Sequence, residues 1–413
     1  MTVREIISKV RVWGIAGVRN YLRDRVSLAI SGAKLARMLA NDRGTVPRRG
    51  ITVIADLSSG GSISKTTRDF ICSLKDAGIP WQSYDTRRLG KMARSEYADL
   101  VTPEAEFDIR KYDHIVEMFS SPLPKCPVKC RARIAFWEGE HGILDVWPFL
   151  DNGDPVIAMS DFNYEYFKRE LLHSKTCKIL YPLRMIKREP PPVAEVRKRF
   201  GIGLNDFVAF YNFDLGSFYR KNPKAVMAAF SKGLKGRKDA RLVFKTMGAS
   251  AHKNRVAELE SCAAELGIAD RFTMITEYLP HELLYGLTAA CDVYVSLHRG
   301  EGFGLGMAEA MLFGKPVVAT GWSSNVEFCP QDGSFLVPYR MVPIKDGEFF
   351  TSMREWAEAD VDAAAEVLAR CYSDRDLCRE VGKRGRKFIE ERFSIANFRK
   401  SVEDFLDETN FTC

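Results

Sequence analysis

VYVSLHRGEGFGLGMAEAMLFGKPVVAT, spanning Val293–Thr320, is the most informative stretch of this 413-residue chain. Its first residues, 293–297, are apolar and β-branched, which predicts a short buried strand. Residues 307–313 are good helix formers, and the Gly314 that follows them is typical of a helix C-terminus. Residues 315–320 predict a second strand. Such short links between strand, helix and strand predict a right-handed parallel βαβ unit.

A glycine-rich turn joins the first strand to the helix, and it carries an acidic residue at each end. Glu301 lies on the turn and Glu309 inside the helix, with seven residues between them. Glycines let a ligand approach the main chain, and N–H groups at the start of a helix attract an anion lying beyond the strand ends. One glutamate could reach a ribose diol while the other lies beside a transferred group. The stretch therefore predicts an enzyme that handles a nucleotide-linked substrate.

Two other interpretations of this turn stay open. A dinucleotide-binding oxidoreductase also uses a glycine-rich turn, but the spacing Gly302-x-Gly304-x-Gly306 departs from its GxGxxG fingerprint. The acid expected about 20 residues later is not in place, since Glu327 follows a Trp/Ser/Asn loop. The turn could also be a purely structural link with two solvated acids. The coincidence of both strands with the acid pair favours the nucleotide interpretation.

The stretch resembles the E-x7-E motif of glycosyltransferase family 4, whose members are retaining enzymes with the two-domain GT-B fold. Its part Ser296–Leu305 resembles the branch found among bacterial surface-polysaccharide enzymes, and the N-terminal half of the chain matches less specifically. The resemblance implies an α/β fold with two Rossmann-like, doubly wound parallel-sheet domains that face a cleft. Further matches are YRKNP at 219–223, RLVFK at 241–245, GKPVVAT at 314–320 and WAEAD at 356–360.

Two cations precede the helix predicted from Pro223. Asn222 and Pro223 are typical of a helix start, and cations at that positive end are costly unless an anion lies nearby. We interpret Arg220 and Lys221 as contacts of a donor diphosphate, with a solvated surface pair as the alternative. Lys221 is the better match to the family's phosphate-binding lysine. Lys245 ends a predicted strand, where α/β sheets place their ligands, with an exposed strand-end lysine as the alternative.

The resemblance and the glycine turns together define a predicted donor site. Glu309 is expected at the ribose, and His298 and Arg299 in the sugar pocket, although a structural histidine is a close alternative. Gly60 and Gly61 follow the first predicted strand; a plain Ser/Gly loop is their alternative. The full predicted donor-binding set is Gly60, Gly61, Arg220, Lys221, Lys245, His298, Arg299, Gly302, Phe303, Gly304, Leu305, Gly306 and Glu309.

Three residues are predicted to act in catalysis: Glu301, Glu138 and His141. Many family members carry a histidine straight after the strand that corresponds to 133–136, whereas Trp137 and Glu138 stand there in this chain. Glu138 or His141 could orient or deprotonate the acceptor hydroxyl, or be solvated loop residues. Retention could arise through a carboxylate nucleophile or by front-face departure. The resemblance favours the second, in which Glu301 holds the sugar.

No metal and no cofactor are expected. Asp360-Val-Asp362 and Asp374-Arg-Asp376 look like metal-binding DxD sequences, but both fit helix starts better, with Asp360 as an N-cap and Ser373 with Asp376 as a capping box. Basic side chains and helix N-termini would then neutralise the leaving diphosphate. Ten scattered cysteines, including a lone CxxxC, make a zinc site unlikely and fit reduced thiols in the cytoplasm.

Composition and charge indicate a globular protein with an unusual start. Apolar residues make up 46% and charged residues 28%, and no apolar run is long enough for a transmembrane helix or typical of a signal peptide. Residues 1–49 hold 11 Lys/Arg and 3 Asp/Glu, whereas the remainder is nearly neutral. Apolar residues at helical spacing in this arm suit an anionic membrane surface at the cytoplasmic face. Packing on the enzyme or on a second subunit is the alternative, and nucleic acid is not an expected partner.

The remaining pattern predicts three parts. They are a basic arm at 1–49, an acceptor-side domain at 50–185 and a nucleotide-sugar domain at 193–393, with a C-terminal helix within 394–413 packing back on the first domain. The proline-rich segment 182–192 is the predicted linker. Strands are predicted at 51–55, 81–84, 114–118, 133–136, 156–159, 178–181, 207–211, 241–244 and 272–275, and helices at 65–77, 161–170, 223–231, 254–266, 281–290 and from 361 onward.

The sequence thus predicts a retaining glycosyltransferase that moves a hexose from a nucleotide diphosphate sugar to a glycan acceptor. The acceptor is expected to be lipid-linked, as in polysaccharide or lipopolysaccharide biosynthesis. A non-catalytic nucleotide-sugar or glycan-binding GT-B module is the alternative, and a phosphorylase or synthase for storage glycan is a third, for which greater length is expected.

Overall fold

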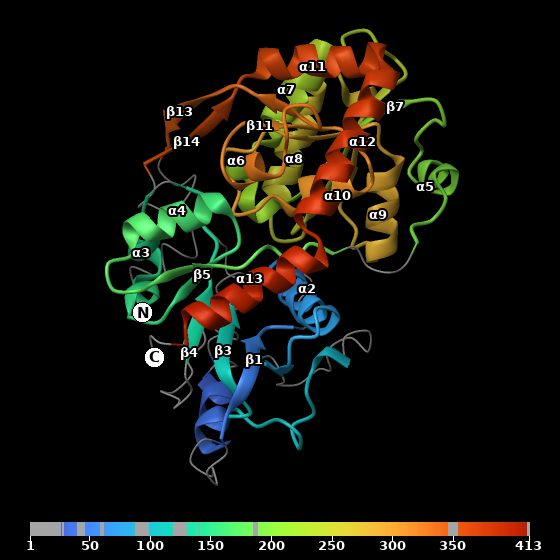
Figure 1. The fold of residues 1–413 in the computed structure, drawn as a ribbon. Coiled ribbons are helices and arrows are strands. Elements are labelled where there is room, and N and C mark those ends of the chain that lie inside the picture. Colours follow the sequence, from blue (N-terminus) through green and yellow to red (C-terminus); the bar gives the residue numbers. More distant parts are fainter. Residues whose placement is uncertain are drawn as a thin grey trace. The chain divides into compact units, whose positions relative to one another are not determined.

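The computed structural model divides into two compact units, each described by itself (Figure 1). The N-terminal unit comprises residues 1–137, 143–184 and 393–413, and the C-terminal unit comprises 138–142 and 185–392. The structure describes residues 26, 29–38, 46–57, 62–86, 99–118, 130–139, 141–184, 189–345 and 354–410.

The N-terminal unit is built on a six-stranded parallel sheet in the order β2-β1-β3-β4-β5-β6. The chain moves outward from β1 first to one side and then to the other, as in a doubly wound fold. The strands are β1 Arg48–Ala55, β2 Trp81–Asp85, β3 Tyr112–Met118, β4 Cys130–Ile134, β5 Val156–Ala158 and β6 Thr176–Lys178. The helical elements are α2 Ser62–Asp76, α3 Ile143–Val146, η2 Pro148–Asp151, α4 Asp161–Glu170 and α13 Ile395–Glu408.

Two helices distant in sequence, α2 and α13, lie side by side on this unit (Figure 1). Phe70 of α2 meets Phe398 of α13 edge to face, with ring centroids 5.7 Å apart. The Ser401 hydroxyl of α13 accepts a hydrogen bond from the Leu180 amide at 3.0 Å. The C-terminal helix therefore completes the core of the unit that the first half of the chain begins.

Only a small part of the predicted basic arm falls within the described residues. Residues 29–38 are helical. Leu35 is buried in a cluster with Ile54 and Tyr84, and Ser31 donates a hydrogen bond to the Thr86 carbonyl at 2.8 Å. This short piece therefore packs on the protein, in line with the second interpretation of the arm. Residues 1–25 lie outside the described residues.

The C-terminal unit contains a second six-stranded parallel sheet, in the order β12-β11-β10-β7-β8-β9, and an antiparallel hairpin of β13 and β14. The strands are β7 Phe207–Asp214, β8 Ala240–Met247, β9 Phe272–Ile275, β10 Val293–Ser296, β11 Val317–Thr320, β12 Phe335–Val337, β13 Tyr339–Pro343 and β14 Glu355–Ala359. The α-helices are α5 Val193–Arg199, α6 Phe218–Lys221, α7 Pro223–Gly233, α8 Lys253–Glu265, α9 His281–Ala290, α10 Leu305–Leu312, α11 Val361–Ser373 and α12 Arg375–Arg392. The 3-10 turns are η3 Leu215–Ser217, η4 Ala269–Arg271 and η5 Ser324–Glu327.

The predicted βαβ unit is confirmed as β10, α10 and β11, with the two strands paired in parallel. The predicted strand at 178–181 is wrong in its bounds, because β6 ends where that prediction begins. The reason is tertiary: the Leu180 amide bonds to Ser401 of α13 instead of a neighbouring strand. No helix among the described residues is long and apolar enough to cross a membrane.

The two predicted helix starts in the last third gave different outcomes. Asp360 caps α11 as predicted, since its carboxylate accepts from the amides of Asp362 and Ala363 at 2.9 and 3.0 Å. The capping box on Ser373 is wrong. Ser373 is the last residue of α11, and the Asp374 carboxylate accepts from the Leu377 amide at 2.8 Å at the start of α12.

Candidate functional site

The glycines of the motif turn are explained by close packing as well as by backbone conformation. Gly304 precedes α10 with φ 99°, in the left-handed region that favours glycine. A Cβ on Gly306 would collide with the Tyr294 hydroxyl of β10 and with the Asn212 side chain of β7. The turn is also tied down through the Gly302 carbonyl, which accepts from the Ser324 hydroxyl at 2.8 Å. The turn is therefore a rigid support for the residues that it carries.

Glu301, the acid on this turn, is buried among cations. Its side chain is 9% exposed, and its carboxylate forms ion pairs with Lys221 and, at 3.4 Å, with Arg220. Its backbone amide donates to the Ser323 hydroxyl at 2.9 Å. Both the backbone and the carboxylate of Glu301 are therefore held in place.

The two cations are the last two residues of the short helix α6, and Asn222 follows it. Asn222 has φ 51°, and its side chain donates to Glu358 at 3.1 Å instead of capping α7, so the predicted side-chain cap is absent. Arg220 donates to the Gly300 carbonyl at 2.8 Å and pairs with Glu138 at 3.4 Å. These contacts join Arg220, Lys221, Glu301 and Glu138 into one group, which we call the four-charge cluster. Two positive and two negative charges balance within it.

The electrostatics of this cluster follow from burial and from the opposite charges. Burial alone raises the pKa of Glu301, but the charges of Lys221 and Arg220 outweigh burial and lower the pKa to about 2. Burial lowers the pKa of Lys221, and the neighbouring Glu301 carboxylate opposes this shift. Burial also lowers the pKa of Arg220, but Glu138 and Glu301 more than offset it and raise the value. Glu301 is therefore an anion at neutral pH.

Glu138 and His141 lie on the segment 138–142, which belongs to the C-terminal unit. The Glu138 side chain is 24% exposed, the most accessible of the cluster. A Cβ on Gly300 would collide with the Glu138 carbonyl, so this segment packs directly on the motif turn. His141 has an exposed side chain. Among these two catalytic candidates, the structure brings Glu138 to the charged group.

Arg299 organises the surroundings of the two cations. Its amide donates to the Arg220 carbonyl at 2.8 Å, and its guanidinium donates to the Tyr219 carbonyl at 3.0 Å. The same guanidinium pairs with Glu358 of β14 at 2.6 Å and lies over the Trp356 ring at 4.8 Å. In this structure Arg299 therefore holds α6 against the β13–β14 hairpin, a positioning function for the residues that carry the cations.

His298 is fully buried in a hydrogen-bond network. Its Nε2 lies 3.2 Å from the Trp322 carbonyl and 3.0 Å from Asn325 Oδ1, while its Nδ1 lies 3.0 Å from the Ser296 hydroxyl. Nδ1 also lies 3.1 Å from the Ser296 carbonyl, so both ring nitrogens have hydrogen-bond partners. Burial lowers the pKa of His298, which keeps the ring neutral. In this structure the imidazole joins β10 to the segment after β11.

Lys245 and Glu309 are both buried near the carboxyl ends of the central strands. Lys245 on β8 lies in register with Asn212 on β7, and its ammonium donates to the Thr246 carbonyl at 2.7 Å. Burial lowers the pKa of Lys245. Glu309 on α10 accepts from the Tyr285 hydroxyl of α9 at 3.3 Å. Gly60 and Gly61 lie outside the described residues.

The sequence interpretation missed several residues that shape the site: Ser323, Ser324, Asn325, Tyr285, Trp356 and Glu358. Ser323 adopts φ 73°, which is uncommon for a residue with a side chain, and holds the Glu301 amide. No sequence pattern marks this conformation. The WAEAD segment was noted as a match to the family, but its link to Arg299 depends on the register of β13 and β14.

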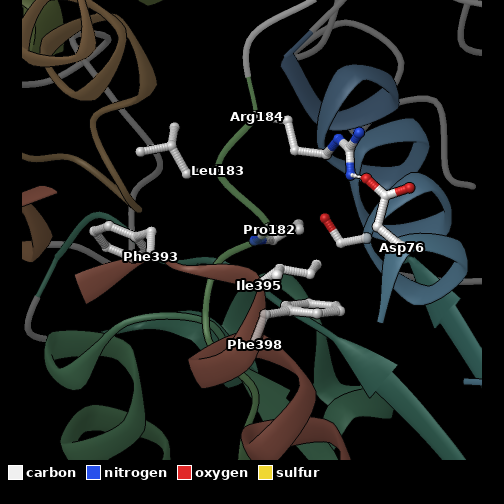
Figure 2. Close-up of a pocket in the computed structure, with 8 residues that line it drawn as sticks. Asp76, Pro182, Leu183, Arg184, Phe393, Ile395 and Phe398 are labelled. Atoms are coloured by element: carbon white, nitrogen blue, oxygen red, sulfur yellow. Dashed lines mark hydrogen bonds and ion pairs between the residues drawn. The ribbon is translucent and has the colours of Figure 1, made fainter. Parts of the chain in front are cut away.

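A separate pocket of about 200 Å³ lies in the N-terminal unit. Figure 2 shows its apolar side chains, from Pro182 to Phe398, facing an ion pair between Arg184 and Asp76. It contains none of the predicted site residues. Within the ranges that the structure describes, no group of three or more His, Cys, Asp or Glu side chains could hold a metal ion.

Residues 213–352 match the family model "Glycosyl transferases group 1". The lipopolysaccharide core biosynthesis mannosyltransferase LpsB of Rhizobium meliloti (strain 1021) is 27% identical over 207 residues, which cover 50% of this chain and 56% of that protein. The chain spans about half the length of the curated relatives it matches.

Two solved structures extend the likeness to most of the chain. Anabaena Alr3699/HepE, crystallised with UDP and glucose, is 17% identical with a TM-score of 0.61, covering 87% of this chain and 100% of that one. A glycosyltransferase from Rickettsia africae ESF-5 is 15% identical with a TM-score of 0.64, covering 89% of this chain and 100% of that one. These structures confirm the GT-B fold class, and the family match confirms the resemblance to glycosyltransferases.

Proposed function

Because residues 213–352 match the group 1 glycosyl transferases and the fold resembles that of solved glycosyltransferases, we propose that this chain is a glycosyltransferase. It transfers a hexose from a nucleotide diphosphate sugar to a glycan acceptor. The relatives named for lipopolysaccharide biosynthesis support a lipid-linked acceptor made at a membrane face. The structure in complex with UDP and glucose supports a nucleotide sugar as the donor.

The observation that carries this proposal is the four-charge cluster. Arg220 and Lys221 are two nearly buried cations beside the glycine turn, at the edge where a parallel α/β sheet binds its ligands. A diphosphate leaving group develops negative charge in the transition state, and fixed cations in a site of low dielectric stabilise that charge strongly. In this proposal the cations neutralise the diphosphate and no metal ion is required.

Glu301 and Glu309 have different tasks in this mechanism. Glu301 is an anion at neutral pH with both faces of its carboxylate near cations, so it positions Lys221 and Arg220 and contacts the sugar. Glu309, held by Tyr285, accepts from the ribose hydroxyls. We propose retention by front-face departure, in which the acceptor attacks the same face that the diphosphate leaves.

The test combines donor binding with product analysis. A thermal-shift and calorimetry panel of UDP-, GDP-, ADP- and dTDP-sugars should reveal one preferred donor, and Lys221→Ala should weaken its binding at least tenfold. Lys224→Ala is the matched control, because it removes the same side chain and charge from an exposed pair with Glu258. Transfer should persist in EDTA and the product anomer should match the donor by NMR. If no nucleotide sugar binds, the proposal is wrong.

The N-terminal arm is proposed to bind the anionic membrane where such acceptors reside. The excess positive charge of residues 1–49 supports this location. Sedimentation with anionic liposomes should fall when residues 1–25 are deleted, while binding of the donor stays unchanged. If the full chain and the variant without residues 1–25 sediment equally, the membrane proposal is wrong and the arm packs on protein instead.

A further inference from the structure

The charge balance of the four-charge cluster sets a condition on anion binding. Its two cations are already neutralised by Glu138 and Glu301. A nucleotide sugar adds a diphosphate with two further negative charges at the same cations. Like charges within a few ångströms in a partly buried site repel each other strongly. One of the two carboxylates must therefore move away or bind a proton when the donor arrives.

Glu301 is the carboxylate that stays. It contacts both cations, its side chain is 9% exposed, and its amide is fixed by Ser323. Its pKa of about 2 also makes protonation costly. Glu138 makes a single ion-pair contact with Arg220 at 3.4 Å, and its side chain is 24% exposed. Water can therefore solvate Glu138 at little cost once it leaves Arg220.

Arg220 itself shows that Glu138 is a poor match for it. A guanidinium binds an oxyanion best through two parallel N–H groups. The Glu138 carboxylate lies 3.4 Å from a terminal nitrogen of Arg220, and the buried Nε has no hydrogen-bond partner among the described residues. A buried N–H without a partner costs free energy. A phosphate can accept from Nε and from the terminal nitrogen together, so it is the better ligand.

The position of Glu138 is built into the motif turn. Its backbone packs on Gly300, where any side chain would collide with the Glu138 carbonyl. The Gly300 carbonyl in turn accepts from Arg220 at 2.8 Å. Gly300 therefore contacts the backbone of Glu138 and also binds Arg220, the cation that Glu138 neutralises.

We propose that Glu138 holds the place of the donor diphosphate on Arg220, and that donor binding displaces it. This inference rests on the proposed function, because it requires a diphosphate ligand. In the free protein Glu138 supplies a second negative charge, so that Arg220 and Lys221 are not neutralised by Glu301 alone. On donor binding the carboxylate is released toward solvent while Glu301 stays in place. Glu138 is therefore an internal competitor that weakens diphosphate binding.

Isothermal calorimetry with UDP, GDP, ADP and dTDP tests this proposal on the full chain. Glu138→Gln keeps the shape and removes the charge, so the Kd of the preferred nucleoside diphosphate should fall about two- to fivefold, the strength of a partly exposed ion pair. The free nucleoside should show no gain. The difference should shrink in 1 M salt because screening weakens the competing pair.

Two controls separate the outcomes. Glu258→Gln removes an equal charge from the same unit and should leave the Kd unchanged within twofold, and Glu138→Ala should reproduce the gain of Glu138→Gln. If neither the wild type nor the variants bind any nucleoside diphosphate, the proposed function fails and takes this inference with it. If the wild type binds a nucleoside diphosphate but neither Glu138 variant binds it more tightly than the wild type does, the proposed function stands. The proposal that Glu138 competes with the diphosphate is then refuted.

Discussion

Each unit of this protein buries a lysine–carboxylate pair, and the two pairs behave in opposite ways. In the N-terminal unit Lys65 and Asp69 pair at 2.5 Å within α2. Burial raises the pKa of Asp69 despite its lysine partner, whereas the pKa of Glu301 falls to about 2. Glu301 contacts a second cation directly, Arg220 at 3.4 Å. The charge of Lys65, with smaller contributions from Arg184 and Arg68, does not offset the burial of Asp69, whereas the charges of Lys221 and Arg220 more than offset the burial of Glu301.

This difference separates two purposes of buried charge. The Lys65–Asp69 pair spans four residues of one helix, so it forms as soon as the helix forms. The Lys221–Glu301 pair joins residues 80 positions apart and exists only in the folded C-terminal unit. A buried ion pair is seldom the most stabilising choice, so a buried, charge-balanced cluster beside the glycine turn is better explained by a ligand-binding role.

The largest expected effect comes from removing the shared anion. Glu301→Ala leaves Lys221 and Arg220 buried with Glu138 as their remaining carboxylate in the cluster, and should reduce the free energy of unfolding of the C-terminal unit by about 3–5 kcal/mol. Urea titration followed by hydrogen exchange of the α6 and β10 peptides measures this loss. Glu258→Ala, on an exposed pair, should cost less than about 1 kcal/mol. A loss of similar size in both variants would contradict the claim that Glu301 stabilises the two buried cations.

Acid should act on the C-terminal unit through Glu301. Its folded pKa of about 2 lies below the ordinary value of 4.5, so the carboxylate adds stability that is present above pH 4.5 and is lost as the pH falls toward 2. The shift corresponds to about 3 kcal/mol. Hydrogen exchange of β10 between pH 5 and 2.5 should show this slope in the wild type. Glu301→Gln should lack it; an identical slope would assign the acid sensitivity to other groups.

Removing the lysine of the Lys65–Asp69 pair in α2 should change the free energy of unfolding less. Its dependence on pH should be opposite to that of Glu301. Lys65→Met removes the ion-pair partner of Asp69, whose pKa is already raised. The variant should lower the free energy of unfolding by about 1–3 kcal/mol at pH 7. Because the folded state holds the Asp69 proton more tightly, stability falls as the pH rises from 3.8, and the cost of the variant should shrink toward pH 4. Urea titration across this range, followed by exchange of the α2 peptides, checks the trend. A constant cost would mean that lost packing dominates.

The smallest expected effect concerns the support of the cations. Arg299→Lys keeps the charge but loses the contact of two guanidinium nitrogens with Glu358 Oε2 and the bond to the Tyr219 carbonyl, and should lower the free energy of unfolding by about 1 kcal/mol. The Kd of the preferred nucleotide should rise two- to fivefold because α6 is held less firmly. This change in Kd corresponds to less than about 1 kcal/mol of binding free energy. Calorimetry measures both variant and wild type. Unchanged affinity would show that α6 keeps its position without Arg299.

Local patterns were sufficient for much of the fold. The apolar run 293–297, the helix formers after Gly304 and the second run ending at Thr320 each carry their own signal, so β10, α10 and β11 were predictable. Asp360 was predictable as a cap for the same reason. The strand after Lys178 failed because α13, more than 200 residues later in the chain, takes the Leu180 amide. The Ser373 cap failed because α11 continues through Ser373, so α12 starts one residue later and its Leu377 amide is capped by Asp374.

The candidate site was predictable as a set of residue types but not as an arrangement. Lys221, Arg220, Glu301 and Glu138 were all named from sequence, each for a separate reason. Their union into one neutral cluster was not, because it depends on α6 meeting the motif turn and on segment 138–142 packing on Gly300. Ser323 and Tyr285 had no signal, since a serine or tyrosine in a loop or helix is common in any protein.

The chain alone thus determines where the strands, helices and glycine turns form, because hydrophobic period, helix propensity and glycine conformations act over a few residues. It also determines that acids and bases gather around the stretch 293–320 and around 220–221. Tertiary structure decides which charges meet and what their protonation states are. The reason is that burial and Coulomb energy depend on distance in space, so Glu301 acquires its pKa of about 2 only when α6 brings two cations to it.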